Sequence, residues 1–167
     1  MSISCNKTDA RTFRVEHPYD DVIMICEGAF PLMETDEMNY RILENAEKSL
    51  KKGGKFIFTT LNALFPLYHS VKDFLNANKG PDETTTQQNT FDLMTFRETS
   101  MVTIVDDSGN KKMIECYERY YTPSEITWYL KGLGFKTIAI YGCQLGAFSR
   151  DRQLTTDDYE MLVIAEK

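Results

Sequence analysis

Residues 21–62 place a strand, a helix and a second strand in immediate succession, which restricts the fold more than any other feature of the sequence. The run Val22–Ile25 is apolar on both faces, as in a strand buried between two layers, and it predicts a strand at residues 21–26. Thr35 can cap the helix that apolar periodicity predicts over 36–51. Gly53 or Gly54 would end that helix before the next apolar strand, "KFIFTTLN". Such a β–α–β unit implies two parallel strands joined by a right-handed crossover, and therefore an α/β fold.

The remaining segments fit a single domain over residues 1–167. Residues 2–7 can form a short strand, residues 63–77 a helix, and residues 135–141 a strand. Residues 91–121 contain two β-rich runs separated by Asp107–Asn110, which predicts a β-hairpin insertion. Thr122–Glu125 opens a further helix, with Pro123 in its first turn and Trp128 expected in the core, and "DDYEMLVIAEK" reads as a buried closing strand.

Composition excludes several classes of function. The net charge of −6 leaves no basic excess for binding nucleic acid non-specifically. Four scattered cysteines without a CxxC pair indicate reduced thiols in a cytoplasmic protein, and two histidines give no zinc site of the usual spacing. No apolar run approaches the ~20 residues that a membrane span needs. We expect no metal, no nucleic acid and no membrane as partners.

Four segments, in their order and spacing, resemble the C-terminal portion of class I S-adenosylmethionine-dependent methyltransferases. They are "TDAR" (8–11), "YDDVIMICEGAF" (19–30), "LKKGGKFIFTTLN" (50–62), and "YYTPSEITWYLKGLGF" (120–135) with the closing "YEMLVIAEK". No single segment is specific, but together they cover nearly the whole chain. The hairpin before "ERYY" most resembles the small-molecule branch of the family, in which an insertion covers the substrate.

The resemblance implies a partial Rossmann-like sheet, mostly parallel with an antiparallel last strand, helices on both faces and the hairpin insertion. In that family the strand matching 21–26 is the fourth and lies beside the first in a sheet ordered 3-2-1-4-5-7-6. The family's Gly-x-Gly-x-Gly turn after the first strand and the acidic residue that binds the ribose have no counterpart in this sequence. Strand 21–26 should therefore lie at the sheet edge, without a protecting lysine or proline inside its apolar run. We expect a homodimer that pairs this strand with its mate, or residues 2–7 folded back beside it.

Two segments are candidates for the S-adenosylmethionine site. Asp9 and Ala10 match the family's "DA", whose carboxylate accepts from the adenine amino group; the alternative is an ordinary turn. Cys26, Gly28 and Phe30 match the segment that lines the methyl-donating end of the cofactor. Gly28 would allow close backbone approach to a ligand.

The candidate catalytic residues are Glu27 and Tyr121. Glu27 can orient or deprotonate a nucleophile, or be a solvated loop acid. Tyr120 and Tyr121 follow the hairpin, where aromatic residues of the resembling enzymes roof the active site; the alternative is ordinary strand packing. Arg119 can bind a substrate carboxylate or phosphate as a fork.

Two further polar residues have competing roles. Asn62, with Thr60, closes the second strand and can line the substrate side, or Asn62 can cap the following helix. His69 is expected to be a partly buried structural histidine rather than a base.

The sequence thus predicts the C-terminal part of an S-adenosylmethionine-dependent methyltransferase that acts on a small molecule. Methyl transfer needs mainly in-line positioning of donor and acceptor, which explains the absence of a conspicuous catalytic motif. The alternative is a non-catalytic chain of this fold, either a binding or assembly module or one that needs a partner chain for its cofactor site. In both cases cofactor binding by this chain alone should be weak or absent.

Overall fold

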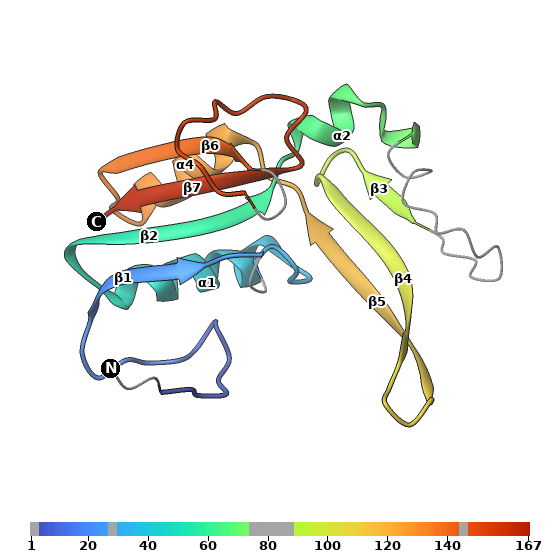
Figure 1. The fold of residues 1–167 in the computed structure, drawn as a ribbon, viewed down its shortest axis with the longest axis horizontal. Coiled ribbons are helices and arrows are strands. Elements are labelled where there is room, and N and C mark those ends of the chain that lie inside the picture. The colour runs from blue at the N-terminus through green and yellow to red at the C-terminus, as the bar shows by residue number, and fades with distance from the viewer. Residues whose placement is uncertain (1–3, 27–29, 74–88, 144–146) are drawn as a thin grey trace.

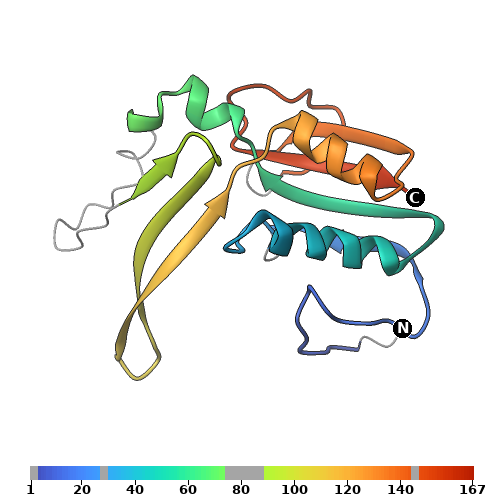
Figure 2. The same ribbon diagram turned by 180° about the vertical axis from the view of Figure 1, so that it is seen from behind.

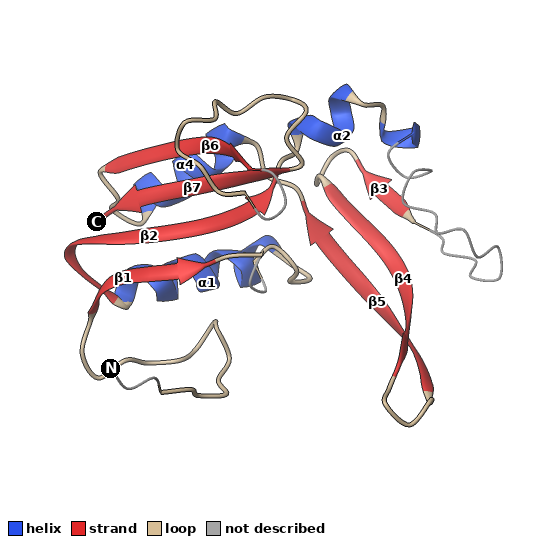
Figure 3. Cartoon of the chain, in the orientation of Figure 1, coloured by secondary structure: helices blue, strands red, loops and turns tan. Residues whose placement is uncertain are grey.

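The computed structural model describes residues 4–26, 30–73, 89–143 and 147–167. A four-stranded sheet with its helices forms one part, and a three-stranded sheet extends from one end of it (Figure 1, Figure 3). The first part contains β1 (Tyr19–Met24), α1 (Asp36–Lys48), β2 (Leu50–Leu61), α2 (Leu64–Tyr68), α4 (Pro123–Gly132), β6 (Thr137–Cys143) and β7 (Glu160–Glu166). The second contains β3 (Thr90–Asp92), β4 (Arg97–Val105) and β5 (Lys111–Arg119).

The larger sheet has the strand order β1-β2-β7-β6. β1 and β2 are parallel and flank the α1 crossover, as the β–α–β unit predicts. β7 is antiparallel to both of its neighbours, β2 and β6. The mostly parallel sheet with an antiparallel last strand is therefore confirmed, and β1 lies at its edge.

One face of this sheet is covered by helices. Phe56 and Phe58 of β2 and Val163 and Ala165 of β7 are fully buried on that face. Both α1 and α4 lie against it, behind the sheet in Figure 1 and in front of it in Figure 2. We expected helices on both faces, but neither of these two helices lies on the other face.

The other face of the sheet is buried at Thr59 and Leu162 but is exposed at β1. The side chains of Val22 and Met24 pack against the core, whereas that of Ile23 is 63 % exposed and that of Ile25 is exposed as well. The expectation that Val22–Ile25 is buried on both faces is therefore wrong for one face. The expected strand at residues 2–7 is also not seen: residues 4–7 form no strand, and among the described residues β1 pairs only with β2.

Local signals set most helix ends. Thr35 caps α1 by accepting from the Met38 N–H, as expected. The helix ends at Lys48, before the predicted residue 51, because Leu50 already pairs with Tyr19 as part of β2. Gly53, with φ of +79°, therefore lies within β2 and is not a helix cap.

The second half of the chain departs from expectation at two points. α4 begins with a capping box between Thr122 and Glu125, with Pro123 in its first turn as predicted. Trp128, expected in the core, is 76 % exposed, because Ile126 and Leu130 supply the buried side of α4. The helix predicted over 63–77 is interrupted: α2 ends at Tyr68, residues 71–73 are helical again, and residues 74–77 lie outside the described residues.

Candidate functional site

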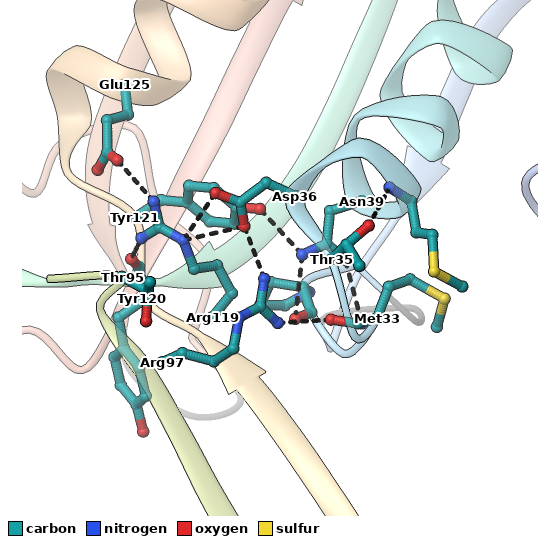
Figure 4. Close-up of polar contacts among 12 residues, drawn as sticks. Met33, Thr35, Asp36, Asn39, Thr95, Arg97, Arg119, Tyr120, Tyr121 and Glu125 are labelled. Carbon is teal, nitrogen blue, oxygen red and sulfur yellow. Dashed lines mark hydrogen bonds and ion pairs between the residues drawn. The ribbon is translucent and has the colours of Figure 1, made fainter. Parts of the chain in front are cut away.

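The base of the hairpin is clamped to the first residue of α1. Arg97 and Arg119 lie directly opposite each other across β4 and β5, and both bind Asp36 (Figure 4). The Arg97 guanidinium donates to Asp36 Oδ1 at 2.6 Å and to the Met33 carbonyl at 2.6 Å. Arg119 Nε donates to Asp36 Oδ1 at 3.2 Å. One carboxylate thus fixes both strands of the insertion against the four-stranded sheet.

Arg119 contacts α4 as well. Its Nη2 donates to Glu125 Oε1 at 2.7 Å, its Nη1 donates to the Tyr120 carbonyl, and its guanidinium lies 4.5 Å from the centre of the Tyr121 ring. Burial alone would lower the pKa of Arg119, but the carboxylates of Glu125 and Asp36 outweigh it and raise that pKa. From the sequence we expected this guanidinium to bind a carboxylate or phosphate of the substrate. In the structure it donates to Asp36, Glu125 and the Tyr120 carbonyl instead.

Tyr121 joins the end of the hairpin to the segment that follows β1. Its ring stacks on Phe30 with centroids 5.0 Å apart, and both side chains are fully buried. The Tyr121 hydroxyl accepts from Asn39 Nδ2 at 3.0 Å, and Asn39 Oδ1 accepts from the Met33 N–H at 3.1 Å. Burial raises the pKa of Tyr121, so the phenol keeps its proton at neutral pH. In this state Tyr121 orders the site rather than serving as a free base.

The opposite face of the hairpin base carries two glutamates. Glu98 and Glu118 face each other across β4 and β5, and Tyr120 Oη donates to Glu98 Oε2 at 3.1 Å. The Tyr120 and Tyr159 hydroxyls lie 2.9 Å apart, and Asn89 Nδ2 donates to Glu98 Oε1 at 3.2 Å. Burial raises the pKa of Glu98, helped by the negative charge of Glu118, and burial raises the pKa of Glu118 too.

Sequence reasoning missed these pairs, although the hairpin turn contained the signal. In an antiparallel pair of strands, two residues that lie opposite each other point to the same face, and successive residues along a strand point to alternate faces. The turn at Asp106–Asn110 fixes the register and therefore determines which residues of β4 and β5 lie opposite each other. That register places the arginine pair on one face of the hairpin base and the glutamate pair on the other. Asp36 was missed because it looked like an ordinary first-turn acid of a helix.

A cleft of about 440 Å³ lies between the hairpin, the start of α1 and the N-terminal turn. Leu32, Met33 and Met38 supply its apolar part. Its charged lining residues are Arg11, Glu34, Glu115 and Glu118. From "TDAR" only Arg11 lines this cleft, and the cofactor candidates Asp9, Ala10, Cys26 and Phe30 are not among its described lining residues.

The N-terminal turn is held internally. Arg11 donates to Asp9 through Nε at 3.0 Å and through Nη2 at 2.6 Å, and the hydrogen bonds from Arg11 lower the pKa of Asp9 to about 2. The Ala10 carbonyl accepts from Asn45 Nδ2 at 3.0 Å, which docks the turn on α1. An adenine amino group at Asp9 would share its carboxylate with Arg11.

The segment between β1 and Phe30 is described only at its ends. Cys26 is exposed and has a φ of +57°, and Phe30 is buried under Tyr121. Glu27 and Gly28, the candidate base and the candidate close-approach glycine, lie outside the described residues. Of the described cofactor candidates, Asp9 is thus paired with Arg11, Cys26 is exposed, and Phe30 is fully buried.

Asn62 has a structural environment. It is fully buried; its Nδ2 donates to the carbonyls of Asp158 at 2.7 Å and Thr155 at 3.2 Å. Its Oδ1 accepts from the N–H of Leu64, the first residue of α2, at 3.1 Å, but the N-cap of α2 is Ala63, so Asn62 is not the cap residue that the alternative expected. Thr60 is also fully buried, and its hydroxyl has no hydrogen-bond partner among the described residues.

His69 follows the last residue of α2, Tyr68. Its side chain is 40 % exposed, and its Nε2 lies 3.1 Å from Asp157 Oδ1. Within the described part of the chain, no group of three or more His, Cys, Asp or Glu side chains could hold a metal ion. Of the helices that the structure describes, none has the length and apolar character needed to cross a membrane.

No family model and no curated protein matches the sequence. Solved structures do match the fold. The CcbJ methyltransferase from Streptomyces caelestis aligns with a TM-score of 0.65 at 12 % identity, over 95 % of this chain and 61 % of that one. An S-adenosylmethionine-dependent methyltransferase from Clostridium acetobutylicum gives a TM-score of 0.61 at 14 % identity, over 95 % and 62 %. The glycopeptide N-methyltransferase MtfA gives 0.52 at 16 % identity, over 95 % and 58 %.

These similarities define the class of fold. The chain has the fold of class I S-adenosylmethionine-dependent methyltransferases, with the sheet order and antiparallel last strand that the sequence resemblance implies. It spans about six-tenths of the length of the solved structures that it matches. MtfA has been solved with S-adenosylmethionine and with S-adenosylhomocysteine.

Proposed function

We propose that the chain is the C-terminal part of an S-adenosylmethionine-dependent methyltransferase that acts on a small molecule. The observation that carries this proposal is the sheet β1-β2-β7-β6 with antiparallel β7 and a three-stranded insertion between α2 and α4. Methyltransferase structures match 95 % of the chain over this arrangement. A fold alone does not set chemistry, so the residues at the carboxyl ends of β1 and β2 must support the activity.

The cofactor would supply the methyl group, and this chain would hold part of it. Asp9 and Ala10 would bind the adenine side, and Cys26 and Gly28 would line the methyl-donating end. Phe30, which is fully buried under Tyr121, would support that end without contacting the cofactor. The 167-residue sequence contains no Gly-x-Gly-x-Gly turn for the methionine end. We infer that a further strand–helix segment or a partner chain completes the pocket beside β1, whose outer edge is unpaired among the described residues.

The cleft between α1 and the hairpin is the proposed acceptor site. Among the described lining residues Arg11 is the one cation and is already paired with Asp9, whereas Glu34 and Glu115 leave the cleft acidic. A small molecule with an amine and an apolar body complements this lining best, since opposite charges attract and Leu32, Met33 and Met38 offer apolar contact. Glu27 would then be the base that accepts a proton from the acceptor.

The second candidate is a non-catalytic module that keeps the fold without the cofactor. It is favoured by the internal use of three candidate residues: Asn62, Arg119 and Tyr121 are all buried, and each binds protein groups. Under this alternative the Asp36 network is purely structural. The coding sequence upstream of Met1 distinguishes the two, since an enzyme requires the Gly-rich turn there or on a partner.

Calorimetric titration with S-adenosylmethionine tests the proposal. The 167-residue chain alone should bind weakly or not at all, because each missing hydrogen bond costs about 0.5–1.5 kcal/mol. The chain joined to a segment that carries the Gly-rich turn should bind and should methylate small amines in preference to carboxylic acids of equal size. A sub-micromolar dissociation constant for the chain alone would refute the incomplete pocket. Absence of binding in the joined form would favour the non-catalytic module.

A further inference from the structure

We propose that Glu98 and Glu118 form a pH-operated latch: a proton on this pair fastens the hairpin insertion to the four-stranded sheet, and loss of the proton loosens it. The two glutamates lie directly opposite each other across β4 and β5, so their side chains point to the same face of the hairpin base. Glu98 is only 3 % exposed, and Glu118 is partly buried. Two ionised carboxylates so placed repel each other, because little water screens them.

No cation balances this pair within the described residues, where neither glutamate forms an ion pair. Arg97 and Arg119 point to the other face of the hairpin base and bind the start of α1. On its other side Glu98 lies opposite Phe91 of β3, which carries no charge. His69, after α2, lies against an aspartate of the β6–β7 connection. The charge of the pair must therefore be met by hydrogen bonds or by a proton.

Hydrogen bonds meet only part of that charge. Tyr120 Oη donates to Glu98 Oε2 at 3.1 Å, and Asn89 Nδ2 donates to Glu98 Oε1 at 3.2 Å. A hydroxyl has one proton, so Tyr120 can donate to only one carboxylate at a time. Burial outweighs these hydrogen bonds and raises the pKa of both Glu98 and Glu118. Asn89 Oδ1, which has no hydrogen-bond partner among the described residues, can accept from a protonated Glu98 once the amide turns over.

The latch lies where the insertion meets the four-stranded part of the protein (Figure 1). Glu98 belongs to β4, Tyr120 lies between β5 and α4, and Tyr159 comes directly before β7. The hydroxyls of the two tyrosines lie 2.9 Å apart, so hydrogen bonds run from the insertion to the approach of β7. The Tyr120 ring packs in a cluster that draws on both parts, formed with Leu61, Ala63, Phe65, Phe91 and Phe96. A charge on Glu98 therefore acts on the contact between the two parts.

The two faces of the hairpin base respond differently to pH. Arginine and aspartate side chains are ordinarily charged throughout pH 5–8, so the clamp on Asp36 persists. The pKa of Glu98 is raised in the folded protein, so the latch is complete below the ordinary value of 4.5 and weakens as pH rises toward the raised pKa. Rising pH thus releases one of two fastenings of the hairpin, which is one wall of the cleft beside α1. This regulation of the insertion does not depend on the proposed methyl transfer.

Hydrogen exchange of backbone amides, measured by NMR from pH 4 to 8 and corrected for intrinsic exchange rates, tests the latch. The Tyr120 N–H donates to the Phe96 carbonyl at 2.9 Å and reports opening of the hairpin base. Its opening should increase with pH, about tenfold for each unit by which folding raises the pKa of the pair. The amides of β2 that pair with β7 should show no such increase. Equal opening at Tyr120 at pH 4 and pH 8 would overturn the proposal.

Substitutions assign the effect to the pair. Glu98→Gln combined with Glu118→Gln should keep the hairpin base closed at pH 8, and a pH dependence that survives this change would overturn the proposal. Asp107→Asn, which neutralises an exposed acid at the turn of the same hairpin, is the matched control and should leave the pH dependence in place. Glu118→Gln alone should shift it to lower pH, because Glu98 then loses a negative neighbour.

A titration of the unmodified protein keeps the test decisive if a variant fails to fold. The side-chain carboxyl carbons of Glu98 and Glu118, followed by NMR, should titrate with apparent pKa values of the pair above the ordinary 4.5. Titration of both groups at or below 4.5 would contradict the latch.

Discussion

Tyr121 stacks on Phe30 with the two ring planes only 8° apart. This contact joins the strand that leaves the hairpin to the segment that leaves β1, the two parts of the chain that sequence reasoning assigned to the active site. The Asn39 side chain bonds both parts through the Tyr121 hydroxyl and the Met33 N–H. The stack therefore fixes the end of the hairpin against the segment that follows β1.

Tyr121→Phe should lower the free energy of unfolding by about 1 kcal/mol, because Asn39 Nδ2 loses a buried partner while the ring stack remains. Urea titration measures this, with the exposed Tyr68→Phe as a control that should change nothing. In a completed enzyme we expect Tyr121→Phe and Glu27→Gln to lower turnover more than stability. Unchanged turnover in either variant would remove that residue from the mechanism.

Glu98→Gln should stabilise the protein at neutral pH. The pKa of Glu98 is raised in the folded state by burial and by Glu118, so the free energy of unfolding falls as pH rises above the ordinary value of 4.5. Glutamine removes this penalty and can still accept from Tyr120. Its amide NH2 would replace the oxygen that accepts from Asn89 Nδ2, so the Asn89 amide must turn over to present its Oδ1, which has no hydrogen-bond partner among the described residues.

We expect a gain of about 1 kcal/mol at pH 7 that shrinks toward pH 4. Thermal melts of both proteins at several pH values measure it, with the exposed Glu166→Gln as control. A loss of stability at pH 7 would mean that the folded protein prefers a charged carboxylate at this position.

Arg119→Met should destabilise the fold by about 2 kcal/mol. The guanidinium is 5 % exposed, whereas its partners Asp36 and Glu125 are 38 % and 34 % exposed. The loss of stability should therefore lie between that for breaking a buried ion pair and that for breaking a surface ion pair. Lys51→Met, which removes an exposed pair with Asp20, should cost less than 1 kcal/mol. Equal losses of free energy of unfolding in the two variants would show that the Asp36 network adds nothing beyond surface electrostatics.

Gly142→Ala should destabilise the protein by about 1–3 kcal/mol, because a Cβ at this position would collide with the Asp158 carboxylate. Asp158 cannot easily move, since Arg152 and Thr155 bind its buried carboxylate. Gly132→Ala in α4 is the control: its nearest neighbour would be the Tyr40 hydroxyl at 3.8 Å, and alanine favours helix, so stability should hold or rise. Chemical denaturation of both variants provides the comparison, and tolerance of Gly142→Ala would show that the Asp158 loop can shift.

Features that depend on a few neighbouring residues could be predicted from the sequence. The Thr35 cap, the Thr122–Pro123 helix start and the hairpin turn act over one turn of chain, so their residues specify them directly. The β–α–β order and the parallel pairing of β1 with β2 follow from hydrophobic periodicity and the handedness of crossovers.

The roles of the site residues depended on tertiary structure. Arg119 and Asn62 carry donors that suit a substrate equally well, but distant carboxylates and carbonyls in the fold bind those donors. Burial of an apolar residue depends likewise on what covers it: Ile23 and Trp128 are apolar, yet the described residues place nothing over either. Local sequence specifies which conformation a segment prefers, whereas the partners of a side chain are set by segments far away in the chain, and only the folded arrangement brings these together.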